Sequence, residues 1–188
     1  MPEMKPAKPE RGGILRLLRG NRYERAGYAL YGAAVAAARQ PVFYAELGVP
    51  DTLDGRFDMV GLHAFLLIRR LTALPVPGPA LAQAMFDAMF NDMDLNLREM
   101  GVGDLSVGRR VRDMWEAFHG RSAAYAAALD GPEPLAGLTE ALARNVWRGA
   151  EAPAGVGRLA SLALAQSRHL ETQELADLRA GKVEFVTS

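Results

Sequence analysis

A chain of 188 residues is long enough for one domain with a sizeable core, and an apolar fraction of 49% indicates neither wholesale disorder nor a membrane-embedded protein. The formal net charge is zero, which argues against a dedicated nucleic-acid-binding protein because such proteins carry a basic surplus. The chain has no cysteine, so disulfides, thiolate metal sites and a cysteine nucleophile are excluded.

The first part of the chain is predicted to be a disordered arm followed by helices. Residues 1–13 are rich in proline and charge, and the domain is expected to occupy residues 14–188. An alanine-rich helix is predicted over residues 23–39, and Pro41 suits the first turn of a short helix that ends at Leu47. Residues 48–56, GVPDTLDGR, are typical of a turn. The helix predicted over residues 57–73 is apolar on nearly every side and is therefore expected to cross the core.

The rest of the chain shows the periodicity of amphipathic helices. After three closely spaced prolines, a helix is predicted over residues 80–100, with Gly101 at its C-terminal cap. Ser106 is the predicted N-cap of the next helix, which ends near Leu129, and two more helices are predicted over residues 135–148 and 157–179. No segment alternates with a period of two. The predicted fold class is therefore all-α, a single-domain bundle of about six to eight helices around a central apolar helix.

Signals of catalysis are sparse. The three histidines, at positions 63, 119 and 169, are scattered and lack the spacing of a zinc protease. An enzyme with an acidic metal site around Asp87, Asp92 and Asp94 is an alternative, although the chain lacks the Glu-x-x-His pairs of di-iron bundles. A solvated or partner-facing polar face explains the same aspartates. We therefore expect no catalytic residue, no cofactor and no metal.

Two apolar patterns have both a core and a binding interpretation. His63 lies in the apolar stretch MVGLHAFLLI, where either a hydrogen-bonded structural histidine or a partner contact would explain it. Met85, Met89 and Met93 form a stripe on one face of the 80–100 helix. Core packing explains this stripe, but so does an open groove for apolar helices, because methionine repacks against varied partners at low cost. We predict that Met89 lines such a groove.

Two long segments resemble the ubiquinol–cytochrome c chaperone family. They are ARQPVFYAELGVPDTLDGRFDMVGLHAFLLIRRL, residues 38–71, and FDAMFNDMDLNLREMGVGDLSVGRRVRDMWEAFHGR, residues 86–121. The resemblance covers residues 30–129, and its motifs VPDTLDGRFDM and NLREMGVGDLSVG are long and unusual in composition. It implies a chaperone that binds newly made cytochrome b and promotes assembly of the ubiquinol–cytochrome c reductase complex without catalysing a reaction. A structural subunit that stays in the mature complex is an alternative function.

The surface that would bind this client is predicted around residues 49–57. Asp54, Arg56 and Asp58 are more polar than a connector requires, and Phe43 and Tyr44 lie nearby in sequence. An Asp-Gly turn with capping carboxylates would explain the same residues. The full set of candidate client-binding residues is Phe43, Tyr44, Asp54, Arg56, Asp58, His63, Met85, Met89 and Met93.

The start of the chain bears on localisation. It resembles neither a secretory signal nor an organelle transit peptide, and the longest apolar run is too short to span a membrane, so a bacterial, cytoplasmic and soluble protein is expected. Residues 1–25 nevertheless carry seven basic and three acidic side chains around an ILRLLR sequence. We expect this segment to touch anionic lipid at the inner face of the cytoplasmic membrane, with a solvated tail as the alternative.

Overall fold

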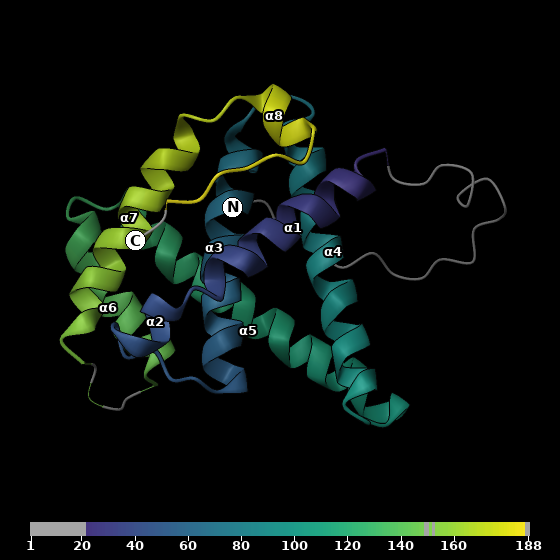
Figure 1. Ribbon diagram of the computed structural model, residues 1–188, viewed down its shortest axis with the longest axis horizontal. Helices are drawn as coiled ribbons and strands as arrows, with labels where there is room; N and C mark the ends of the chain where they lie inside the picture. Colours follow the sequence, from purple (N-terminus) through teal and green to yellow (C-terminus); the bar gives the residue numbers. More distant parts are fainter. Residues whose placement is uncertain (1–21, 149–150, 152, 187–188) are drawn as a thin grey trace, which may run out of the picture.

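A computed structural model describes residues 22–148, 151 and 153–186, and every regular element in these residues is a helix. Figure 1 shows them as a bundle in which α3 runs through the middle, with α1 crossing α3 and α4 on one side. The helices are α1 (Glu24–Ala38), α2 (Pro41–Ala45), α3 (Leu53–Ala73), α4 (Gly78–Glu99), α5 (Asp104–Asp130), α6 (Pro134–Val146), α7 (Gly155–Glu171) and α8 (Leu175–Arg179). The all-α prediction and the predicted number of helices are confirmed.

Helix α3 is the central element, as its composition predicts. Seven consecutive residues, Leu62 to Ile68, are buried, so every side of the helix at this level faces another part of the protein. Helices α1, α4 and α7 pack against it, and α5 and α6 touch it as well. A helix surrounded in this way loses the polar face that a surface helix keeps.

Helices α1 and α4 approach each other closely at one glycine. A Cβ atom built on Gly27 would lie 2.6 Å from the carbonyl carbon and oxygen of Ala84, so only glycine fits there. Helix α4 then ends where the sequence predicts, because Gly101 takes a left-handed conformation with a φ of 79°. The α4–α5 pair forms an arm that extends from the body of the bundle, at the lower right of Figure 1.

Three predicted boundaries are wrong. Helix α3 begins at Leu53, because the side chain of Thr52 accepts a hydrogen bond from Gly55 N at 3.1 Å and caps the helix before the Asp-Gly pair. Helix α5 begins at Asp104 after Gly103, so Ser106 lies inside the helix and is not its N-cap. The last predicted helix is two helices, because the chain turns at residues 172–174 between α7 and α8.

The predicted disordered arm, residues 1–13, and most of the basic segment, residues 1–21, lie outside the described residues. Within the part of the chain that the structure describes, no helix is both long and apolar enough to cross a membrane.

Candidate functional site

The loop between α2 and α3, at the edge of the predicted client-binding surface, is fixed against α6 and α7. Trp147, just after α6, donates a hydrogen bond from Nε1 to the carbonyl oxygen of Gly48 at 3.0 Å. At the start of α7, a Cβ on Gly155 would lie 2.5 Å from the carbonyl oxygen of Leu47, so this glycine permits close contact between the two segments. The loop is therefore a rigid part of the bundle.

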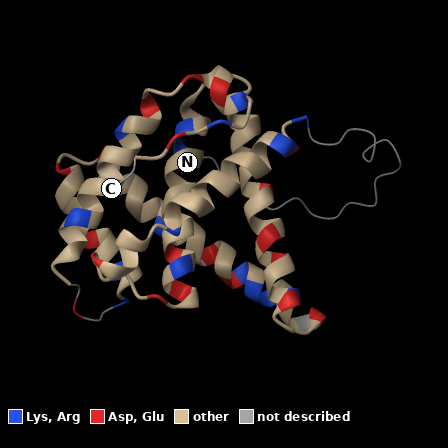
Figure 2. Ribbon diagram, in the orientation of Figure 1, with Lys and Arg blue, Asp and Glu red and all other residues tan. Residues whose placement is uncertain are grey.

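The first turn of α3 carries the exposed charges of the site. Arg56 and Asp51 form an ion pair with 2.7 Å between Nε and Oδ1, and the hydrogen bond from Arg56 lowers the pKa of Asp51. Both side chains are more than half exposed, so this pair contributes little to stability. Asp54 is also exposed and pairs with Arg148, which follows α6. Figure 2 shows basic and acidic residues interspersed at this end of α3.

Asp58, one turn further along α3, is the buried member of this group. Its carboxylate lies 2.9 Å from Arg121 of α5 and 3.1 Å from Arg148, and only 2% of the residue is exposed. Burial raises the pKa of Asp58 to about 6, although both arginines act in the opposite direction. Arg148 holds Asp54 and Asp58 together from a left-handed backbone with a φ of 51°, which is uncommon for a residue with a side chain. This ion cluster ties α3, α5 and the end of α6 together.

The predicted aromatic residues have separate environments. The ring of Phe43 is buried and meets the ring of His63 with their centroids 5.4 Å apart. His63 donates from Nδ1 to the carbonyl oxygen of Met59 at 2.8 Å, and burial lowers its pKa to about 4, so the imidazole is neutral near pH 7. Tyr44 is half-buried and donates its hydroxyl to the carbonyl oxygen of Ala38 at 2.9 Å. Phe43 and His63 thus contact each other in the interior, whereas Asp54 and Asp58 pair with arginines that follow α6 or belong to α5.

The methionine stripe is part of the core. Met85 and Met89 have no exposed surface and Met93 is 6% exposed, so none of them lines an open groove. The prediction that Met89 lines a groove is therefore wrong for this conformation. The helix periodicity that indicated the stripe is the same for a core face and a groove face, and here α1 and α3 pack on α4.

The three aspartates of the acidic alternative are engaged by separate neighbours. Asp87 accepts a hydrogen bond from Gln83 at 2.8 Å, Asp92 accepts one from the hydroxyl of Tyr31 at 2.8 Å, and Asp94 pairs with Arg98 at 2.6 Å. Over residues 22–148, 151 and 153–186, no group of three or more histidine or carboxylate side chains could hold a metal ion.

The sequence did not indicate three residues of the site that are distant in sequence from their partners. Arg121, Trp147 and Arg148 come from α5 and the end of α6. They lie far along the chain from their partners, which are Asp58 of α3 for the two arginines and Gly48 of the preceding loop for Trp147. Nothing local in the sequence indicates these pairings, because each depends on how the helices pack.

Comparisons with known proteins agree on one group. Residues 45–185 match the family described as ubiquinol-cytochrome C chaperone. The chain is 24% identical over 123 residues to the ubiquinol-cytochrome-c reductase complex assembly factor 1 of Xenopus laevis, and the match spans 65% of this chain and only 58% of that relative. Among solved structures, the crystal structure of the Cbp3 homolog from Brucella abortus is similar, with a TM-score of 0.79 and 36% identity, over 93% of this chain and 97% of that one.

Proposed function

This chain belongs to the ubiquinol-cytochrome C chaperone family, and we propose that it binds newly made cytochrome b until the ubiquinol–cytochrome c reductase complex is assembled. The observation that supports this proposal is the extent of the family match. The match comprises α3 to α8, so it includes the central helix and the helices α4, α5, α6 and α7 that contact it. The client itself is inferred from the family resemblance of residues 38–71 and 86–121.

We further infer that the protein acts by binding and not by catalysis. Two polar groups of the candidate site that could transfer protons have structural partners. The carboxylate of Asp58 is held between two arginines, and the imidazole of His63 is neutral and bonded to the main chain. An occupied polar group is poorly placed to transfer protons to a substrate.

We propose that the exposed charges at the start of α3, Asp51, Asp54 and Arg56, form the rim of the client-binding surface. The buried Asp58 cluster fixes this rim to α5 and to the end of α6. The rim is thus presented on a rigid base, which reduces the ordering cost of binding.

The test is recovery of cytochrome b with the tagged protein from respiring cells. The native chain should enrich cytochrome b from assembly intermediates, whereas recovery with the finished complex would indicate a structural subunit. The double charge reversal Asp54→Lys/Arg56→Glu should reduce recovery about tenfold or more, an effect of about 1.4 kcal/mol.

The matched control for this variant is Arg109→Glu/Asp113→Lys on α5. Both positions are exposed, and the ion pairs described for α3 involve neither of them, so the control changes the same charges elsewhere on the surface. Circular dichroism should show that both variants fold. Equal recovery with both variants would place the client elsewhere.

We also propose that the protein works in the cytoplasm, at the inner face of the membrane, through its basic N-terminal segment. Each basic residue near an anionic surface contributes about 1 kcal/mol to membrane binding. Sedimentation with anionic vesicles should therefore pellet the full chain and leave a version without its first 20 or so residues in solution. Equal pelleting would refute the contact.

A further inference from the structure

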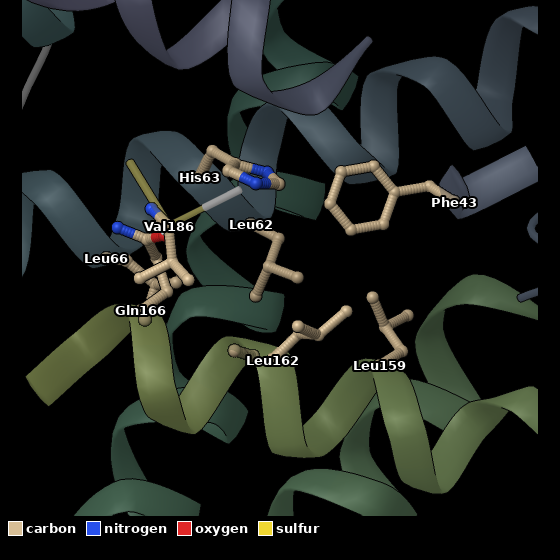
Figure 3. Close-up of a pocket in the computed structure, with 9 residues that line it drawn as sticks. Phe43, Leu62, His63, Leu66, Leu159, Leu162, Gln166 and Val186 are labelled. Carbon is tan, nitrogen blue, oxygen red and sulfur yellow. Dashed lines mark hydrogen bonds between the residues drawn. The ribbon is translucent and has the colours of Figure 1, made fainter. Parts of the chain in front are cut away.

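The segment from Lys182 to Val186 lies in an apolar groove between α3 and α7. After Gly181, which has a φ of 77°, the chain runs back from α8 across α3 to α7 (Figure 1). The side chains of Val183 and Phe185 pack against the core, and the ring of Phe185 meets that of His63 with the centroids 5.6 Å apart. We call this the α3–α7 groove; its walls are Leu62, His63 and Leu66 of α3 and Leu159, Leu162 and Gln166 of α7 (Figure 3).

Two glutamines hold the main chain of this segment. Gln173 binds both main-chain groups of Glu184, donating from Nε2 to the carbonyl oxygen at 2.6 Å and accepting from the amide at 3.0 Å. Gln166 accepts from the amide of Val186 at 2.7 Å. In the described residues, no main-chain group outside the segment bonds to residues 183–186. The groove therefore binds the main chain of an extended segment through side-chain amides.

The side-chain amide of Gln166 makes only part of the hydrogen bonds that it could make. Gln166 is only 4% exposed, yet its Nε2 has no hydrogen-bond partner, whereas the equivalent atom of Gln173 has one. In an extended strand, the N–H and C=O of one residue point to the same side, so a regular strand would offer Gln166 both groups. A buried donor without a partner costs about 1–3 kcal/mol, and this deficit favours a strand that continues in register.

The segment also leaves part of the groove unfilled. A cavity of about 20 Å³ remains between Phe43, His63, Leu162, Gln166 and Val186 (Figure 3). This is room for roughly one water molecule, in an otherwise apolar wall. A guest with a larger side chain at the position of Val186 would fill it.

We propose that the α3–α7 groove binds an extended, apolar segment of the client protein, and that residues 182–186 are an internal occupant that the client displaces. The choice of a protein client rests on the proposed function. The internal occupant shows what fits: alternate apolar residues, an aromatic ring over His63, and two main-chain residues aligned with Gln173 and Gln166. Peptide recognition of this kind draws affinity from the main chain and specificity from alternate side chains.

The test uses a fluorescent peptide with the sequence of residues 181–188, GKVEFVTS, and the full chain. The native protein should bind it weakly, because its own segment occupies the groove. Phe185→Asp, which removes the aromatic contact, and Glu184→Pro, which removes the amide that Gln173 binds, should each bind it at least about tenfold more tightly, since apparent affinity scales with the open fraction. If one of the two variants fails to fold, the other still tests the proposal, and thermal melting shows whether each of them is folded.

Matched changes in the groove complete the design. Adding Gln173→Ala to Phe185→Asp should abolish the gain, whereas adding Gln83→Ala, an amide on α4 outside the groove, should leave it intact. Weak binding by every variant, or binding unaffected by Gln173→Ala, would overturn the proposal. If cytochrome b is recovered equally by Phe185→Asp and by Phe185→Asp/Gln173→Ala, the groove is not its site and the chaperone function stands. If the peptide binds as expected but cytochrome b is never recovered, the groove stands as a peptide site and the proposed function fails.

Discussion

Truncation of Met89 to alanine should destabilise the protein, because this side chain has no exposed surface. Replacing a buried methionine by alanine costs about 2–5 kcal/mol, and the cost depends on how far the site can collapse. Collapse is limited here, because α1 and α4 already touch through main chain at Gly27 and Ala84. We expect a loss of about 3 kcal/mol, which for a domain of this size lowers the melting temperature by about 6–12 °C.

Met100 is the matched control, since it caps the same helix with 54% of its surface exposed. Met100→Ala should change stability by less than about 0.5 kcal/mol. Urea unfolding followed by circular dichroism measures both variants, and recovery of cytochrome b is measured at a temperature where both are folded. If Met89→Ala loses less than about 1 kcal/mol while its recovery of cytochrome b falls about tenfold, then Met89 binds the client and the argument from burial is wrong.

Three further changes test the region around α3. Arg121→Met should cost about 3 kcal/mol at pH 7, because Asp58 then lies buried with one arginine fewer. Burial already raises the pKa of Asp58 to about 6 in the folded protein, and this pKa should rise further without Arg121. A carboxyl group whose pKa is raised by folding binds its proton more tightly in the folded state, so the variant should regain stability relative to the native chain as the pH falls from about 7 to 5. A deficit that does not change with pH in urea unfolding would contradict this assignment. Thr52→Ala should lose about 1 kcal/mol through the missing helix cap while Thr52→Ser loses almost none, as chemical denaturation can show. Trp147→Phe removes the hydrogen bond to Gly48 and should lower the melting temperature by about 2–4 °C; an unchanged melt would mean that water replaces the bond at no cost.

The helices could be predicted from the sequence wherever local chemistry decides them. The apolar composition of residues 57–73 identifies α3 as central, and Gly101 marks the end of α4. The prediction fails where one local signal competes with another. The Asp-Gly pair at 54–55 is typical of a turn, but Thr52 caps the helix ahead of it, and a Cβ on Gly55 would lie 2.0 Å from the carbonyl oxygen of Pro50. Glycine is needed there for close packing and not for a turn.

The candidate site was predictable only in part, for a different reason. Sequence places Asp54, Arg56 and Asp58 on one stretch, but it cannot show that Asp58 is buried and that Arg148 holds it. In the same way, a methionine stripe at helical spacing is identical in a core and in a groove until its neighbours are known. The glutamines of the α3–α7 groove carry no sequence signal, because their role depends on where residues 182–186 return.

Because residues 182–186 are held differently from the helices, the protein should open in two ways: global separation of the helices and local release of this segment. Amides of α3 can exchange their hydrogens with solvent only when the surrounding helices separate, which amounts to global unfolding. The amides of Glu184 and Val186 are protected by glutamine side chains alone, so rotation of two side chains exposes them while the bundle stays closed. Release of residues 182–186 therefore breaks only the glutamine hydrogen bonds and the packing of Val183 and Phe185, while the helices keep their contacts with one another.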